Sequence, residues 1–288
     1  GVDGGSATDG GGIYNDVPGT ISVTANSCGV DGGSIQRSIA TGAGGGLYNL
    51  GSLTVDAGVD LWVTGNGKGN DATSGGGIYQ GGGATDIAGD GRLDTLSVGK
   101  NGGAIEVSGG TFATSGAGLI SISKTGAGGS GGGIAVTGGS LDVSTVIDSA
   151  IASNGAGVAV LGSGSASLRS SAILNSSAMQ GGGIWVGDGT SLNVLNSTIG
   201  RNSGSGGGID VQNASLSLRY VTVADNFPFG LRSNSGASLS AVLMARNNGS
   251  NCQGVSSGGD RNVFDESTCS PTGGDLTETL FEEELVRI

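Results

Sequence analysis

A short phrase of two or three small residues, mostly glycine, followed by one aliphatic residue recurs along the whole chain. The aliphatic residues of the copies are Ile13, Leu47, Ile78, Ile105, Ile134, Val158, Ile184, Ile209 and Leu231. Successive copies lie 22 to 34 residues apart. A period of this size is typical of solenoids, in which each repeat is one unit that stacks on the next. It constrains the architecture strongly and the function weakly, because stacked coils occur in enzymes, adhesins and scaffolds alike.

Within one repeat, apolar and polar residues alternate in three short runs. The run Ile184-Trp185-Val186 is followed by Ser191-Leu192-Asn193-Val194 and then by Ser197-Thr198-Ile199. Alternation with a period of two marks strands that bury one face. We therefore predict an all-β chain, a right-handed parallel β-helix solenoid of roughly ten three-strand coils stacked about 4.8 Å apart.

The predicted core consists of columns of aliphatic residues that stack from coil to coil. The first strand of each coil contributes the nine aliphatic residues given above. The second strand contributes Ile21 and Val23, Leu53 and Val55, Leu141 and Val143, Leu192 and Val194, Leu216 and Leu218, and Leu239. One coil cannot bury its apolar face alone, but a stack of coils buries a continuous core.

Two polar columns are also predicted. An aliphatic residue or Met is followed three positions later by Asn at Ile151-Asn154, Ile199-Asn202, Val223-Asn226 and Met244-Asn247. Asn tolerates the left-handed backbone conformation, and stacked Asn side chains can bond along a column. Where later coils carry Val136, Val160, Val186 and Val211, the first three carry Asn15, Asn49 and Gln80. If these three side chains point into the core, they form a short ladder of hydrogen-bonded amides. If the strand has already turned outward at this position, they are solvated. We slightly favour the ladder.

Aromatic residues occupy the outward position of the first strand in several coils. Tyr14, Tyr48 and Tyr79 hold it in the first three coils, and Trp185 holds it in a later one. An exposed aromatic strip is a candidate binding surface for carbohydrate or a partner protein. The alternative is cross-coil stacking that only stabilises the sheet. The sequence leaves both interpretations open.

Composition excludes several classes of function. The net charge is −12 with only 12 Lys and Arg residues, so no basic stripe is available for nucleic acid. No apolar run is long enough to span a membrane as a helix. The chain has no His, which removes His-based triads, His metal ligands and His general bases.

The charged residues form no obvious catalytic constellation. The outward column contains Glu106, Asp210 and Arg232, which we expect to lie coils apart. The densest acidic and basic set is Asp188, Asp210 and Asp225 with Arg201 and Arg219, and a solvated surface explains it best. No catalytic residue and no metal ligand is assigned. Calcium is the one cofactor that the sequence leaves open, through Asp3, Asp9, Asp16, Asp31 and Asn70-Asp71 in glycine-rich turns.

The pattern changes near residue 250. We predict a parallel β-helix over residues 1–250 and, over residues 251–288, a loop closed by a disulfide and a short helix that caps the core or serves as an assembly tail. Cys252 and Cys269 are the predicted disulfide pair, with two free thiols as the alternative, and Cys28 is left over. The helix is expected from Thr279 to Ile288.

These repeats resemble a known class of protein. Gly102-Gly103-Ala104-Ile105 and the trailing aliphatic-x-x-Asn resemble the repeats of polymorphic outer-membrane proteins and related pectin-lyase-like β-helix surface proteins. The stretch from Asn251 to Cys269 looks like the ends of many secreted bacterial β-helix repeat proteins. The resemblance implies the fold and a secreted or cell-surface location. It does not imply one activity, since lyases, hydrolases and adhesins share this shape.

We therefore expect a non-enzymatic extracellular structural or adhesive protein, such as a surface passenger, adhesin or filament subunit. Its expected partners are further copies, joined end to end, or host or matrix carbohydrate and protein. The alternative is a pectin-lyase-like carbohydrate-active enzyme that acts on polysaccharide.

Overall fold

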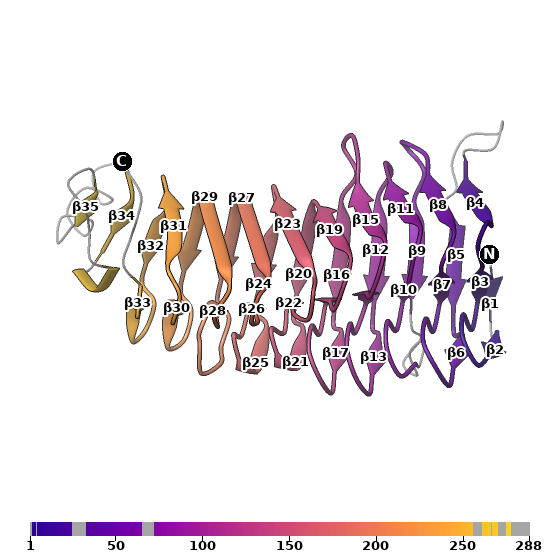
Figure 1. Cartoon of the computed structure of the whole chain (residues 1–288), viewed down its shortest axis with the longest axis horizontal. Coiled ribbons are helices and arrows are strands. Elements are labelled where there is room, and N and C mark those ends of the chain that lie inside the picture. Colours follow the sequence, from indigo (N-terminus) through magenta and orange to yellow (C-terminus); the bar gives the residue numbers. More distant parts are fainter. Residues whose placement is uncertain are drawn as a thin grey trace.

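The chain winds into a row of coils that forms a long rod, with strand β1 at one end and strand β35 at the other (Figure 1). The computed structural model describes residues 2–3, 5–24, 33–64, 72–255, 261–265, 267–269 and 275–277. Each strand pairs in parallel with the equivalent strand of the next coil. This arrangement confirms the predicted parallel β-helix. None of the helical structure in the described residues is long and apolar enough to cross a membrane.

The first strand of each coil belongs to a sheet of ten short strands, called the first sheet below. They are β3 (Ile13–Asn15), β7 (Leu47–Asn49), β10 (Ile78–Gln80), β14 (Ile105–Val107), β18 (Ile134–Val136), β22 (Val158–Val160), β26 (Ile184–Val186), β28 (Ile209–Val211), β30 (Phe229–Ser233) and β33 (Ser250–Gln253). The predicted aliphatic column is in register from Ile13 to Leu231. All of it is buried except Ile13, which is half-buried.

The second and third strands of the coils join in one large sheet, called the second sheet. The second strands are β4 (Thr20–Val23), β8 (Ser52–Val55), β11 (Ala84–Ile87), β15 (Thr111–Thr114), β19 (Ser140–Val143), β23 (Ser165–Arg169) and β31 (Ala237–Ser240). The third strands are β5 (Gly33–Gln36), β9 (Leu61–Thr64), β12 (Gly91–Asp94), β16 (Ile120–Ser123), β20 (Thr145–Asp148), β24 (Ala172–Leu174) and β32 (Leu243–Ala245). The short strands β1 (Val2–Asp3), β34 (Val263–Phe264) and β35 (Leu276–Thr277) extend this sheet.

In two later coils the second and third strands fuse into one. Strand β27 runs from Ser191 to Gly200 and β29 from Ser215 to Ala224. Each turns the corner at a single left-handed residue, Asn196 with φ 50° or Tyr220 with φ 56°. In earlier coils the same corner takes several residues, as between the end of β11 at Ile87 and the start of β12. The predicted aliphatic pairs of the second strand face the core in both kinds of coil.

Short strands that the sequence did not predict lie after the third strand in several coils. They form two small sheets: β2 (Ser6–Ala7) with β6 (Ile39–Ala40), and β13 (Ser97–Val98), β17 (Gly126–Ala127), β21 (Ile151–Asn154) and β25 (Ser177–Gln180). The prediction that Ile151 and Asn154 belong to the Asn column is therefore wrong. Ile151 is 65% exposed on β21, and Asn154 donates to the Ser130 hydroxyl at 3.3 Å.

The predicted amide ladder exists at the N-terminal end of the core. Asn15 Nδ2 donates to Asn49 Oδ1 at 2.6 Å, and Asn49 Nδ2 donates to Gln80 Oε1 at 2.9 Å. Thr85 joins the network, because its hydroxyl accepts from Asn49 and donates to Gln80. All four residues are buried. We call Asn15, Asn49, Gln80 and Thr85 the amide ladder.

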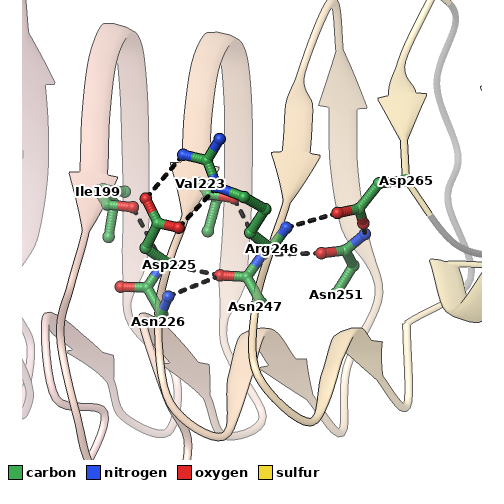
Figure 2. A network of polar contacts seen from close by, with 8 residues as sticks. All are labelled: Ile199, Val223, Asp225, Asn226, Arg246, Asn247, Asn251 and Asp265. Carbon is green, nitrogen blue, oxygen red and sulfur yellow. Dashed lines mark hydrogen bonds and ion pairs between the residues drawn. The ribbon is translucent and has the colours of Figure 1, made fainter. Parts of the chain in front are cut away.

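A second ladder of Asn side chains stacks at the corner after the third strand, as predicted for Asn202, Asn226 and Asn247. Each Oδ1 of Asn226 and Asn247 accepts from the backbone N–H and from Nδ2 of the Asn one coil earlier. Each Nδ2 also donates to a backbone carbonyl, Ile199 in the case of Asn226. Figure 2 shows the row from Asn226 through Asn247 to Asn251. We call Asn202, Asn226, Asn247 and Asn251 the asparagine ladder.

The predicted disulfide is formed at the C-terminal end. It joins Cys252 of β33 to Cys269 of the 3-10 helix η1 (Ser267–Cys269), and both residues are buried. Met244 Sδ lies 3.6 Å from Cys252 Sγ and 3.7 Å from Cys269 Sγ. Cys28, the helix expected from Thr279 to Ile288, Asp31 and Asn70-Asp71 lie outside the described residues.

Candidate functional site

One column of residues runs along the first sheet on the face opposite its core aliphatics, and we call it the outer column. From coil to coil it reads Tyr14, Tyr48, Tyr79, Glu106, Ala135, Ala159, Trp185, Asp210, Arg232 and Gln253. Parts of it are buried because the glycine-rich segment before each strand folds back against this face. A Cβ added at Gly206, for example, would lie 2.4 Å from Cβ of Asp210.

The three tyrosines form one continuous stack. The ring centroids of Tyr14 and Tyr48 are 5.0 Å apart with planes 7° from parallel, and those of Tyr48 and Tyr79 are 4.9 Å apart at 17°. Each ring therefore covers the face of its neighbour, and the faces between them are closed to a sugar ring. The hydroxyl of Ser108 donates to Tyr79 Oη at 2.6 Å. Burial, followed by the charges of Tyr79 and nearby carboxylates, raises the pKa of Tyr48. This geometry favours a cross-coil stabilising role for the stack.

The structure does not bring Trp185 to the tyrosines. It lies four strands beyond Tyr79 in the first sheet, a separation of about 19 Å at the usual strand spacing. Its ring packs over Gly187, where an added Cβ would come within 2.8 Å of Trp185 Cη2. The indole Nε1 is buried without a hydrogen-bond partner among the described residues. The four predicted binding residues thus share a column but not a site.

Glu106 lies directly after the tyrosines in the outer column. Its side chain is 6% exposed, and Oε1 accepts from the Thr137 hydroxyl at 3.1 Å. Within the described residues Oε2 is buried and has no hydrogen-bond partner. Burial raises the pKa of Glu106, against the opposing effects of Ser74, Thr137 and Lys100. Glu106 is thus a buried carboxyl group held toward its protonated form.

Asp210 and Arg232 form a charge pair in the same column. We expected these residues to lie coils apart, but β28 and β30 are neighbours and place them side by side. Arg232 Nε donates to Asp210 Oδ1 at 3.0 Å, Nη2 pairs with Oδ2, and Nη1 donates to the Ser205 carbonyl at 3.2 Å. Gln212 Nε2 also donates to Asp210 Oδ1, at 2.8 Å. The hydrogen bond with Asp210 raises the pKa of Arg232, and Asp210 is fully buried. The carboxylate is therefore neutralised and closed to solvent.

A groove of about 530 Å³ opens above this pair, and we call it the amide groove. It is lined by Gln180, Gln212, Arg232, Ser233, Asn234, Gln253 and Gly254. Its walls come from different parts of the coil, because Gln180 belongs to β25 and Gln253 to β33. Side-chain amides and a guanidinium supply donors and acceptors that suit the hydroxyl groups of a carbohydrate chain.

Most of the other charged residues that the sequence singled out are engaged separately, although Arg201 lies near Asp225, whose pKa is lowered by its hydrogen bond with Arg246 and also by the charge of Arg201. Asp225 pairs with Arg246 beside the asparagine ladder, with Nε and Oδ1 2.8 Å apart (Figure 2). Asp188 accepts from Asn213 Nδ2 at 3.1 Å. The Arg219 guanidinium lies 4.9 Å from the ring centroid of Tyr220. These side chains are engaged locally and build no shared cleft.

The described acidic residues proposed as calcium ligands are also engaged separately. Asp3 pairs with Arg37, Asp9 Oδ1 accepts from the Ala43 amide at 2.7 Å, and Asp16 Oδ1 accepts from the Val17 amide at 2.8 Å. Over the described ranges of the chain, no three Asp, Glu or Cys side chains gather closely enough to hold a metal ion.

A family model of the right-handed β-helix region matches residues 99–268, more than half of the chain. The chain belongs to this right-handed β-helix family. Comparisons with curated proteins and with solved structures gave no match. The family includes both pectin-lyase-like enzymes and adhesins, so membership in it does not decide between the two functions.

Two geometric facts bear on that choice in this β-helix. The buried carboxyl groups of the outer column, Glu106 and Asp210, lie four strands apart, about 19 Å at the usual spacing. Glycosidases place their two carboxyl groups about 5 to 9.5 Å apart. Asp210 is also paired with Arg232. Because of this pairing, Asp210 is not a free carboxylate and Arg232 is not a free base for catalysis.

Sequence reasoning missed the amide groove. Gln180, Gln212, Asn234 and Gln253 each look like ordinary polar surface residues in isolation. One signal was available, since Asp210 and Arg232 occupy equivalent positions in consecutive repeats and so had to be neighbours. Aligning those two repeats strand by strand would have found the pair, whose Arg232 lines the groove.

Proposed function

We propose that this protein is a non-enzymatic extracellular rod that adheres to polysaccharide through the amide groove. The observation that carries the proposal is the convergence of Gln180, Gln212, Asn234 and Gln253 around Arg232, whose charge is already balanced by Asp210. Gln212, Asn234 and Arg232 are fixed by bonds within the protein, and the exposed amides of Gln180 and Gln253 lie beside them, so the surface offers hydrogen bonds to hydroxyl groups with little net charge. It suits recognition of a sugar chain better than its cleavage.

The rest of the molecule supports an extracellular, structural role. The buried Cys252–Cys269 disulfide is the kind of bond that persists in oxidising compartments. The stacked coils share one continuous apolar core, so neighbouring coils hold each other in place along the rod. A rigid rod carries a lateral groove away from its point of attachment, which is what an adhesin or a surface passenger requires.

Binding to immobilised polysaccharides tests the proposal. The wild type and the double variant Gln180→Ala/Gln253→Ala are compared on pectin, cellulose, xylan and mannan by surface plasmon resonance. Both glutamines are exposed, so the fold is expected to survive their truncation. We expect at least a tenfold loss of affinity on the bound polysaccharide, since two donor-acceptor groups are removed.

Asn193→Ala is the matched control, because it removes an exposed amide from β27 on the second sheet, away from the groove. It should bind like the wild type. Equal binding by the double variant, or binding to none of the four polysaccharides, would overturn the assignment of the groove.

One observation favours the enzymatic alternative, namely the buried Glu106 with its raised pKa. A carboxyl group in this state can serve as a general acid. The check is to incubate the protein with the same polysaccharides and measure new reducing ends and unsaturated products. We expect none. Product formation that disappears in Glu106→Gln would replace the adhesive proposal with a catalytic one.

A further inference from the structure

We propose a second carbohydrate site, on the outer face of the second sheet, that binds one pyranose ring of a neutral glycan against Trp62. Trp62 belongs to β9 and is 47% exposed, although it stands between the buried Leu61 and Val63. A large aromatic side chain held rigidly on a strand, with half of its surface in solvent, provides an apolar surface for the C–H groups of a sugar.

The surroundings of Trp62 leave its ring accessible. Its register neighbours in the second sheet are Ser34, which is small, and Arg92. The cation–π contact found in the described residues is that of Arg219 with Tyr220, so the Arg92 guanidinium does not cover the indole. The tyrosine rings of the first sheet cover one another, whereas Trp62 stands alone. It is therefore the better sugar platform of the two aromatic features.

A depression of about 290 Å³ adjoins the ring, and we call it the Trp62 site. It is lined by Trp62, Asp90, Gly91, Arg92, Leu119, Ser121 and Ser123. Pockets for small ligands usually measure about 300 to 1,000 Å³, so this one has the size of a single sugar residue. The indole forms one wall, and the polar side chains of β12 and β16 form the others. The apolar wall suits the C–H groups of a pyranose ring. The hydroxyl, carboxylate and guanidinium groups suit its hydroxyl groups.

The charges select a neutral sugar over an acidic one. Arg92 pairs with Asp94 at 3.6 Å, and the exposed Asp90 lies in the same depression. Burial opposes ionisation of Asp94, but hydrogen bonds from Ser123 and Thr95, together with Arg92, hold its pKa below its usual value. Among the residues that line the depression, the cation is Arg92, which is already paired with Asp94, whereas the exposed Asp90 adds a carboxylate, so a uronic acid would be repelled by Asp90 without gaining an unpaired cation.

The site is independent of the amide groove and does not rest on the proposed function. It lies on a different sheet and several coils away, since Trp62 is in β9 whereas the groove is built from β25, β30 and β33. The two can therefore be tested separately. The chain has only two tryptophans, Trp62 and Trp185, which gives the test a local optical signal.

The experiment uses the full chain carrying Trp185→Phe, so that Trp62 is the only fluorophore of its kind. Tryptophan emission is followed during titration with laminarihexaose, xylohexaose, mannohexaose and hexagalacturonate. We expect a saturable change in emission with at least one of the three neutral oligosaccharides. Its dissociation constant should be at least tenfold lower than that for hexagalacturonate.

Calorimetry with the best neutral hexasaccharide then compares three variants with the wild type. Trp62→Ala in the wild-type background should weaken binding at least tenfold, because it removes the aromatic wall. Thr198→Ala is the matched control, an exposed residue of the second sheet in a later coil, and should change nothing. Gln180→Ala/Gln253→Ala should also leave this binding intact, which separates the Trp62 site from the amide groove.

Several outcomes would overturn the Trp62 site. No change in Trp62 emission with all three neutral oligosaccharides would do so, as would unweakened binding by Trp62→Ala. Tighter binding of hexagalacturonate would contradict the charge argument and with it the proposed ligand class. Circular dichroism of each variant shows whether the fold is retained; if Trp62→Ala loses it, Trp62→Phe, which keeps a smaller ring, takes its place with an intermediate affinity expected.

Discussion

The two ends of the rod stack amide side chains in different ways. At the N-terminal end the amide ladder occupies the inward position of the first strand, which valines fill in later coils. At the C-terminal end Asn202, Asn226 and Asn247 of the asparagine ladder occupy the corner after the third strand, and Asn251 joins them from β33. In both places most of the amides bond to an equivalent amide one coil away, as Asn15 does to Asn49 and Asn226 to Asn247. A solenoid can thus bury an amide side chain wherever the neighbouring coil provides a hydrogen-bond partner for it.

The two ladders differ in the groups to which their side-chain amides hydrogen-bond. The amide ladder bonds mainly side chain to side chain, with Thr85 completing the network. The asparagine ladder also satisfies the backbone, since Asn226 accepts from the Asn202 N–H and donates to the Ile199 carbonyl. Asn202 lies beyond the end of β27, and the Asn226 side chain supplies the acceptor for its backbone N–H. We infer that the asparagine ladder is the more essential of the two.

The largest effect is expected from Asn226→Ala. Asn226 is fully buried, and its side chain makes four hydrogen bonds with groups of neighbouring coils. Truncation leaves buried donors and acceptors unpaired, which should lower the free energy of unfolding by about 3 kcal/mol. Urea titration followed by circular dichroism measures the change. Asn193→Ala, at an exposed position of β27, serves as the control and should shift stability by less than about 0.5 kcal/mol. A loss at Asn226 of similar small size would show that the asparagine ladder is dispensable.

The amide ladder should respond differently, because its groups can be removed together. Asn49→Val alone leaves Asn15, Gln80 and Thr85 without their partner and should cost about 2 kcal/mol. Replacing all four residues with Val extends the apolar column of the later coils through Asn15, Asn49 and Gln80 and makes the position of Thr85 on β11 apolar, like its register neighbours Leu53 and Phe112. That variant should recover part of the loss, because the side chains that bond to one another are removed together, whereas the Ser52 and Gly82 carbonyls lose a side-chain donor. Urea midpoints of the two variants decide the point. If the fourfold variant is less stable than the single one, the ladder contributes more than mutual satisfaction.

A smaller effect is expected at the centre of the tyrosine stack. Tyr48→Ala separates Tyr14 from Tyr79 and removes two stacked contacts, each of which contributes about 0.5 to 1.5 kcal/mol. Tyr48→Phe keeps both contacts and should match the wild type within about 0.5 kcal/mol. Thermal unfolding of the two variants distinguishes ring stacking from the hydroxyl group. If Tyr48→Ala leaves stability unchanged and impairs ligand binding instead, the stack is a recognition surface and not a structural one.

The periodic part of the structure could be predicted from the sequence, because equivalent positions of successive coils point into the same core. The column from Ile13 to Leu231 and the amide ladder both follow from aligning one strand with the next. The error at Ile151 and Asn154 shows where this reasoning fails. Their spacing equals that of Ile199 and Asn202, yet they lie on β21, a strand absent from the later coils. A local motif does not identify its strand when coils differ in length.

The candidate sites were predictable only where they share a column. The tyrosine stack and the Asp210–Arg232 pair involve neighbouring residues of one column. The amide groove and the Trp62 site combine side chains from different strands and turns, such as Gln180 with Gln253 and Trp62 with Leu119. Their convergence depends on how turns fold around the coil, and turn length varies from one repeat to the next.

The smallest effect is expected where the tyrosine stack ends, at Glu106. Because burial raises its pKa in the folded protein, Glu106 stays protonated to a higher pH there than in the unfolded chain. Below about pH 4 it is protonated in both states and adds no pH dependence. As the pH rises through the folded pKa, the folded protein must ionise a buried carboxyl group and loses stability. Glu106→Gln keeps a neutral group of the same shape, so its urea midpoint should exceed that of the wild type at pH 7 and equal it near pH 4. Asp56→Asn, which changes an exposed carboxylate, should show no such divergence. A Glu106→Gln variant that is less stable than the wild type at pH 7 would mean that Thr137 and its neighbours stabilise the ionised carboxylate more than burial disfavours it.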